Sequence, residues 1–249
     1  LDACSGILWR GKDEGGGDRA AGSKPPGGEP VQRGFWNKEG GFSMLHRETV
    51  SGSTLDLLIR LSELPELGSF ALAGGTSLAL RFGHRLSEDL DFFSHEVFDN
   101  EELKLLLTLE FDFDHRRSQP TGITGFVEGV RVDFVKYRYP LVQPFEVIEG
   151  IRLMSLADVV AMKLSAVTNR GAKKDFFDLH ELIGRLGLAK LLEFYNAKFP
   201  GTDPMMLARS LVYFEDAEEQ AEPVSLKNVC WEDVKEGIVG AVREAMLRP

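Results

Sequence analysis

Two aspartates separated by one residue, Asp89 and Asp91, form the pair in this sequence best suited to chemistry. They open the segment 89–93, in which polar and apolar residues alternate as they do on a half-buried strand. Because residues two apart on a strand point to the same side, both carboxylates can converge on one small volume. Two carboxylates there repel each other unless a cation joins them, and oxygen ligands favour Mg²⁺ or Mn²⁺. The alternative is that both lie on the solvated face of an edge strand.

A glycine turn that could hold a phosphate lies upstream of this pair. Gly74-Gly75-Thr76 follows a short buried strand expected over Phe70 to Ala73 and precedes helical spacing from Ser77 to Phe82. A turn of this kind that opens a helix can present backbone N–H groups to a phosphate. Ser87, two residues before the first aspartate, adds a hydroxyl on the same side. A simple tight turn is the alternative for the glycines.

A third carboxylate, Asp133, lies on a strand expected over Val130 to Lys136. A hairpin turn at Glu128-Gly129 would join this strand to another over Gly122 to Val127. Alternation places Asp133 and Arg131 on the face opposite the most apolar residues. Asp133 could thus complete a two-metal clamp, in which one ion helps to activate an acceptor hydroxyl and the other neutralises a triphosphate and the leaving pyrophosphate. Pairing with Arg131 alone is the alternative.

A lysine interrupts the inward-facing row of a helix expected over Leu156 to Asn169. Positions 156, 160, 163 and 167 form one stripe, and Lys163 occupies the third of them. An ammonium directed inward needs an anionic partner, which a phosphate or a carboxylate cluster would provide, whereas snorkelling to the surface is the alternative. On the next expected helix, Lys173 to Leu186, Asp175 and Asp178 are one turn apart and could face Lys163. They could also only stabilise the N-terminus of that helix.

Five further basic residues lie near these positions. His84 and Arg85, just before the acidic strand, could touch a triphosphate, and His115-Arg116-Arg117 could help to hold RNA. Since isolated charged residues are mostly exposed, we expect ordinary surface charge at both places. The sequence shows no Ser-His-Asp or Cys-His arrangement that would support nucleophilic catalysis.

The remaining pattern predicts a mixed α/β first half and a helical second half. An amphipathic helix is expected from about Ser53 to Leu64, and another over Asn100 to Leu109 after the acidic strand. We expect residues 44–150 to form an α/β domain and residues 151–249 a helical C-terminal lobe. Besides the two helices named above, that lobe should contain helices over Leu188 to Phe199, Pro204 to Phe214 and Trp231 to Leu247.

The composition is that of an ordinary globular protein, with 249 residues of which 43% are hydrophobic. No apolar run approaches the roughly 18 to 20 residues that cross a bilayer, so we expect a cytoplasmic protein without a membrane partner. The net charge of −10 argues against general coating of nucleic acid. Two cysteines, Cys4 and Cys230, support neither a disulfide framework nor a cysteine zinc site. The glycine-rich residues 1–43 are expected to be disordered and a non-native extension, with Met44 as the natural start.

Taken in order, these motifs resemble those of AbiEii-type nucleotidyltransferase toxins. The resemblance covers about residues 70 to 180 and rests on a glycine turn, a D-x-D pair and a K-D-x-x-D run. In this chain the three are Gly74-Gly75-Thr76 with Leu78, the segment from His84 to Phe93, and Lys163-Leu164 with Lys174 to Asp178. The resemblance implies a polymerase-beta-like nucleotidyltransferase fold with a helical C-terminal lobe. It also implies a toxin of a type IV toxin–antitoxin or phage-defence system.

The same resemblance implies roles for the residues. Asp89 and Asp91 would bind Mg²⁺, Ser87 and the glycine turn would hold the triphosphate, and Lys163 and Asp175 would complete the active site. The implied substrate is a nucleoside triphosphate, the implied acceptor is tRNA, as in some relatives, and the implied partner is a cognate antitoxin. In one departure, this sequence has Gly75 followed by Thr76 where the family often shows serine after the first glycine. The hydroxyl is thereby displaced by one residue.

Three other functions compete with this interpretation. A haloacid-dehalogenase-like phosphatase also uses D-x-D, but there the aspartates close an apolar strand, whereas here they open one. A catalytically silent binding module would keep the fold and serve as a partner-binding subunit. Transfer of a nucleotide to a small molecule would use the same residues, so the sequence does not separate it from transfer to tRNA or protein.

Overall fold

The computed structural model describes residues 44–247. The expected disorder and non-native origin of residues 1–43 therefore lie outside the described residues. Within residues 44–247, no helix has both the length and the apolar character needed to span a membrane.

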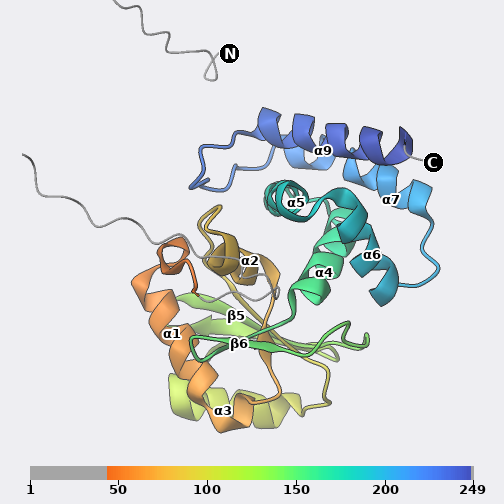
Figure 1. Ribbon diagram of the computed structural model, residues 1–249. Coiled ribbons are helices and arrows are strands. Elements are labelled where there is room, and N and C mark those ends of the chain that lie inside the picture. Colours follow the sequence, from red (N-terminus) through yellow and green to blue (C-terminus); the bar gives the residue numbers. More distant parts are fainter. Residues whose placement is uncertain (1–43, 248–249) are drawn as a thin grey trace, which may run out of the picture. The chain divides into compact units, whose positions relative to one another are not determined.

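Seven strands of the described chain form one mixed sheet in the order β3-β4-β5-β2-β1-β7-β6 (Figure 1). The parallel pairs are β2 with β5 and β1 with β7, and the other neighbours are antiparallel. Glu128 and Gly129 join β4 to β5 with φ of 52° and 81°, the two positive values that a type I′ hairpin turn requires. The strands are β1 (Ala71–Leu72), β2 (Leu90–Ser94), β3 (Asp114–Gln119), β4 (Gly122–Val127), β5 (Val130–Lys136), β6 (Glu146–Ile148) and β7 (Ile151–Leu153).

Helices flank the sheet and make up most of the described chain after residue 155. Side chains of Ser51, Asp99, Ser155 and Asp203 accept hydrogen bonds from first-turn N–H groups and so fix four of the helix starts. The helices are α1 (Gly52–Glu63), α2 (Gly74–Phe82), α3 (Asn100–Phe111), α4 (Leu156–Asn169), α5 (Lys173–Leu186), α6 (Leu188–Lys198), α7 (Pro204–Leu211), α8 (Glu215–Glu218) and α9 (Trp231–Leu247), with short 3-10 turns at Arg47–Thr49 and Pro65–Leu67.

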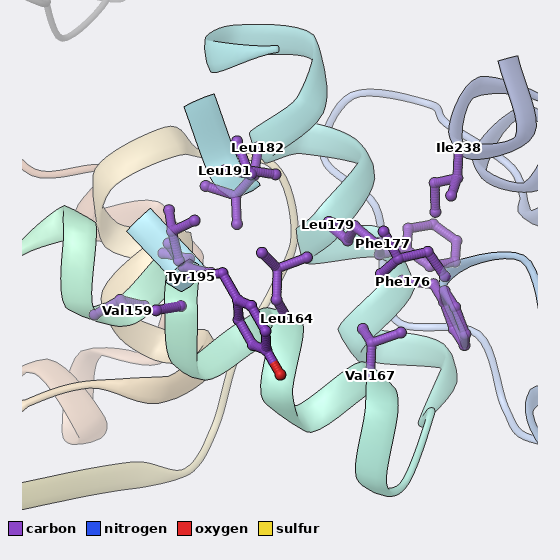
Figure 2. Packing of buried hydrophobic residues seen from close by; sticks show 14 of the residues in the cluster. Val159, Leu164, Val167, Phe176, Phe177, Leu179, Leu182, Leu191, Tyr195 and Ile238 are labelled. Carbon is purple, nitrogen blue, oxygen red and sulfur yellow. The ribbon is translucent and has the colours of Figure 1, made fainter. Parts of the chain in front are cut away.

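Two hydrophobic clusters lie on opposite faces of the sheet. On one face α1 and α3 cover apolar strand residues such as Phe92 and Phe134. On the other face α2 and α4 contribute to a cluster that continues into α5, α6, α7 and α9, and Figure 2 shows part of its packing around Leu164 and Phe176. Strand alternation therefore directs Asp91, next to Phe92, toward the face that carries α2 and α4.

The expected mixed α/β fold with a helical C-terminal lobe is confirmed, and the predicted bounds of β4, β5, α4, α5 and α9 are those of the structure. Several details differ. Asp89 was expected on the acidic strand, but β2 begins at Leu90, so Asp89 directly precedes the strand. The glycine turn is itself the first turn of α2; β3, β6 and β7 were not expected; and the helix from Pro204 ends at Leu211 instead of Phe214. Because β7 pairs with β1, the sheet runs three residues beyond the expected boundary at residue 150.

Candidate active site

Asp91 lies near the centre of the sheet, where β2 meets both β1 and β5. In the parallel pairing of β2 with β5, Asp91 lies directly opposite Asp133. Two of the three predicted carboxylates are therefore neighbours. The N–H of Ala73 donates to the Asp91 carbonyl at 2.8 Å and holds β2 against the start of α2. The carboxylate itself rests on Gly74, where an added Cβ would lie only 2.2 Å from Oδ2. The acid is therefore fixed at the N-terminus of a helix.

Asp91 is in an electrostatically unfavourable position. Burial, reinforced by the negative charges of Asp133 and Asp89, raises the pKa of Asp91 to about 6, and Lys163 and Lys174 offset this only in part. Among residues 44–247 the structure shows no donor in hydrogen-bonding contact with the Asp91 carboxylate. A partly buried carboxylate that lies beside other acids and has no hydrogen-bond donor is unfavourable in its charged form unless a cation compensates it.

The other two carboxylates of the predicted metal site have different surroundings. Asp89 has a side chain 39% exposed, and Lys174 Nζ lies 3.5 Å from its Oδ2. Asp133 accepts a hydrogen bond from Thr124 and pairs with Arg131 at 3.0 Å, which is the pairing the sequence left open. Among residues 44–247, no group of three or more histidine, cysteine, aspartate or glutamate side chains is arranged to hold a metal ion.

Two carboxylates, Asp89 and Asp91, nevertheless fit a hard divalent cation. Mg²⁺ is usually bound through one or two carboxylates and keeps several water molecules and substrate phosphate oxygens. The missing hydrogen-bond partner of Asp91 and its raised pKa are the features that such an ion would compensate. Both Asp133 carboxylate oxygens already have protein partners, Thr124 and Arg131.

The two glycines of the turn are required by close approaches on opposite sides. Gly74 has φ of +64° and lies against Asp91, whereas a Cβ on Gly75 would lie 2.1 Å from Arg85 Nη2. Ala73, which precedes the helix, makes no side-chain hydrogen bond to the first turn of α2. The N–H groups of that turn are therefore not capped by a side chain at this position, and a phosphate could accept from them.

Gly74→Ala is expected to remove most nucleotide transfer, because the new Cβ displaces the Asp91 carboxylate. The positive φ adds a backbone strain of about 1 kcal/mol or more. Gly150→Ala is the matched control, since Gly150 has φ of +82° with no atom within 4 Å of an added Cβ. Transfer rates and thermal melting of both variants separate the effect of backbone strain from the effect of displacing the Asp91 carboxylate. Equal activity of the two variants would show that the contact with Asp91 is unimportant.

Thr76 and Ser87 connect the glycine turn to the acidic strand. The Thr76 hydroxyl donates to the Asp89 carbonyl and lies 2.8 Å from Ser87 Oγ. Thr76 is 1% exposed, so the structure places its hydroxyl inside the fold, away from the open space at Asp91. The two hydroxyls hold the segment that positions Asp89.

Lys163 lies at the centre of a buried ionic cluster. Its Nζ is 2.8 Å from Asp175 Oδ1 and 2.8 Å from Asp178 Oδ2, and the lysine is 5% exposed. The predicted inward direction of Lys163 and its contact with both aspartates are therefore confirmed, and snorkelling does not occur. Burial alone would lower the pKa of Lys163, but the charges of Asp178 and Asp175 outweigh it and raise the pKa.

His84 and Arg85 belong to the same cluster, which corrects the expectation of surface charge. They are 5% and 3% exposed. Asp178 Oδ1 accepts from Arg85 Nε at 2.7 Å and lies 2.7 Å from His84 Nε2, while Asp178 Oδ2 accepts from Arg85 Nη2 at 2.9 Å. Burial would raise the pKa of Asp178, but the charges of Arg85 and Lys163 hold it well below the usual value. The expectation of surface charge was wrong because Asp178, the partner of both residues, is more than 90 positions away in the sequence.

Arg170 was missed by the sequence interpretation. Its Nε and Nη2 donate to Asp175 at 2.8 and 3.0 Å, while 60% of its side chain remains exposed. Burial would raise the pKa of Asp175, but the charges of Lys163 and Arg170 and the hydrogen bonds from both lower it. The position of Arg170 at the end of α4, one turn after a row of buried residues, gave no sign of this contact.

A cavity of about 170 Å³ joins these groups. Of the predicted site residues, Gly74, Asp91 and Lys163 line this cavity, and Arg170 lines it as well. Asp175 does not line it but binds Lys163 and Arg170, which do. A carboxylate, two cations and a helix N-terminus around one small space can bind a polyphosphate and a divalent ion. The remaining lining residues are Phe93, Val159, Met162 and Ala166.

The family follows from two comparisons with known proteins. A model of the family described as nucleotidyl transferase AbiEii toxin, type IV TA system, matches residues 56–148 and 126–244. The chain belongs to the AbiEii nucleotidyltransferase toxin family. The uncharacterised protein aq_aa25 of Aquifex aeolicus (strain VF5) is 33% identical to this AbiEii chain over 199 residues. The match covers 76% of this chain and 94% of the relative.

One solved structure shares the fold, and another is similar in part. MenT4, the nucleotidyltransferase toxin Rv2826c from Mycobacterium tuberculosis H37Rv, matches with a TM-score of 0.52 and 18% identity, covering 76% of this AbiEii chain and 80% of MenT4. JHP933 from Helicobacter pylori matches with a TM-score of 0.49 and 19% identity, covering 78% and 92% of the two chains. This AbiEii protein is a nucleotidyltransferase, and the expected nucleotidyltransferase fold is confirmed.

Proposed function

We propose that this protein transfers a nucleotide from a nucleoside triphosphate to a hydroxyl group of tRNA, with Mg²⁺ or Mn²⁺ held by Asp89 and Asp91. The observation that carries the proposal is the partly buried Asp91 carboxylate, which has a raised pKa, lies beside two other acids and rests on the uncapped start of α2. That arrangement is costly for a structural residue and is what a metal-assisted phosphoryl site needs.

The reaction forms a bond between the acceptor oxygen and the α-phosphorus and breaks the bond from that phosphorus to the β-phosphate oxygen. Pyrophosphate leaves, and the acceptor proton passes to solvent or to a nearby carboxylate. A divalent ion held by Asp89 and Asp91 would neutralise negative charge and lower the pKa of the acceptor hydroxyl. The N–H groups of Gly75 and the following residues bind phosphate oxygens, and the Arg170 guanidinium, fixed by Asp175, attracts the leaving pyrophosphate.

Lys163 would contact the triphosphate as a cation that is already paired with two aspartates. Both of its ion pairs are with buried aspartates, so its charge is already balanced within the protein. It faces the cavity from α4 and offsets part of the raised pKa of Asp91. We assign Lys163 to binding of the triphosphate, with Asp175 as the residue that positions both Lys163 and Arg170.

The tRNA acceptor and the antitoxin partner are inferred from the family. Its description as a type IV toxin supports growth inhibition in the cell and a cognate antitoxin as partner. The choice of tRNA rests on the resemblance of the motifs to relatives that modify acceptor ends. The net charge of −10 argues against binding of RNA through a general basic surface.

Purified protein incubated with Mg²⁺, total tRNA and each labelled nucleoside triphosphate in turn is expected to place label in RNA. Chelation of the divalent ion should abolish labelling. Asp91→Asn should remove nearly all of the labelling. Asp56→Asn is its matched control, because exposed Asp56 lies on α1 and pairs with Arg60. Label in a small molecule or in protein instead of RNA would overturn the tRNA acceptor and leave the transferase. No label in any acceptor would favour a silent binding module.

A further inference from the structure

A second cavity, of about 300 Å³, opens beside the cavity at Asp91. Three residues line both cavities: Met162, Ala166 and Arg170. The second cavity is near the lower end of the volume range of small-molecule sites in proteins. Its other lining residues are Tyr137, Tyr139, Ser165, Asn169 and Phe199. It therefore combines an aromatic wall, supplied by the chain after β5 and the end of α6, with polar groups of α4.

The aromatic wall is held in place by ring contacts. The Tyr139 and Phe199 ring centroids are 4.9 Å apart at an interplanar angle of 81°, and Tyr139 lies 5.6 Å from Tyr137. Phe199 in turn packs against buried Tyr195 at 5.1 Å. Tyr139 is nevertheless 52% exposed. An exposed ring fixed by its neighbours can stack with a planar ligand at little further cost in conformational entropy.

The polar side of this cavity carries Asn169 and Arg170. Asn169 Nδ2 donates to the Ser165 carbonyl at 2.8 Å and to Ser165 Oγ at 3.2 Å. Its Oδ1 has no hydrogen-bond donor among the residues that the structure describes. Asn169 is exposed and lines the same cavity as the aromatic residues, so its amide oxygen is free to accept a hydrogen bond from the edge of a base.

We propose that this second cavity is a nucleobase subsite in which Tyr139 stacks on the base and Asn169 contacts its polar edge. The shared wall places a base here while its phosphates lie at Asp91 and Arg170. The subsite rests on the proposed function, because both require that the protein binds a nucleotide. Stacking on an aromatic side chain contributes about 1 to 3 kcal/mol per base, which is about 5- to 150-fold in affinity. The base belongs either to the nucleoside triphosphate or to the end of the acceptor.

Equilibrium binding to the full chain tests the subsite without relying on catalysis. The probes are each nucleoside triphosphate with Mg²⁺, each nucleoside monophosphate, and short single-stranded RNA. Tyr139→Ala is expected to weaken binding of the ligand that occupies the subsite by about 5- to 150-fold, whereas Tyr139→Phe keeps the ring and should stay within about twofold. Asn169→Ala is expected to reduce the discrimination between bases. Melting curves show whether each variant is folded.

The outcomes separate the subsite from the proposed function. Loss confined to mononucleotides assigns the base to the donor, and loss confined to RNA assigns it to the acceptor. Tyr139→Ala should raise KM for the ligand that occupies the subsite while kcat at saturation is retained. Equal affinity of wild type and Tyr139→Ala for every probe overturns the subsite, even if transfer is intact. Ring-dependent binding without any transfer would support the subsite and overturn the proposed function.

Discussion

Asp91→Asn is expected to lower nucleotide transfer by about a thousandfold near neutral pH with saturating Mg²⁺. The substitution keeps the shape of the side chain but removes the charge that holds the ion, and a metal ion contributes several kcal/mol of transition-state stabilisation. The Cα pairing of residue 91 with residue 133 and its contact with Gly74 should persist. Single-turnover transfer of labelled nucleotide measures the effect, with Asp56→Asn as control.

The same substitution is expected to stabilise the protein. The pKa of Asp91 is about 6, above the 3.8 of the free side chain, so folding disfavours the charged form. This cost is absent below pH 3.8, grows as the pH rises toward about 6, and is complete above it. It amounts to at most about 3 kcal/mol, or several degrees in Tm. Thermal melting from acid to neutral pH should show Asp91→Asn and wild type diverging over this window.

Added Mg²⁺ supplies the decisive comparison for Asp91. It should raise the Tm of wild type, because it compensates the buried charge, and leave that of Asp91→Asn nearly unchanged. Transfer at the wild-type rate by Asp91→Asn would refute the metal assignment. Full loss of transfer together with a lower Tm at neutral pH would instead show that the aspartate serves the fold.

The elements that carry the site were predictable because their signals are local. Helical spacing fixed α4 and α5, and strand alternation showed which face of β5 carries Asp133. The pairing of β2 with β5 joins segments some forty residues apart, and no pattern within either strand specifies the register that sets Asp91 beside Asp133. The chemical character of single residues was therefore easier to predict than the distances between residues on different strands.

The surroundings of the charged residues were less predictable. Arg85 and Asp178 are 93 positions apart, so the contact that buries both is invisible to a local pattern. The polar segment of β3 has mostly exposed side chains and shows no alternation, which is why it was not expected to be a strand. Strands β6 and β7 have three residues each, too few to show a period.

Asp178→Ala is expected to lower the stability of the protein by about 3 to 5 kcal/mol. Asp178 is fully buried and accepts from or pairs with Arg85, His84 and Lys163, so its removal leaves buried cations uncompensated. Because its pKa lies well below 3.8, the effect should be complete at every pH above about 4 and fade only in acid. Thermal and urea unfolding measure it.

Asp114→Ala is the control for Asp178→Ala, because it removes an aspartate from the exposed pair with Arg116 and should change the Tm little. Arg85 also lies against Gly75, so the loss of Asp178 should loosen the first turn of α2 and lower transfer even in the fraction that remains folded. Activity measured well below the lowered Tm tests this second effect. A variant with wild-type stability would contradict the buried cluster, whereas one with lowered stability but full transfer would show that the cluster supports the fold alone.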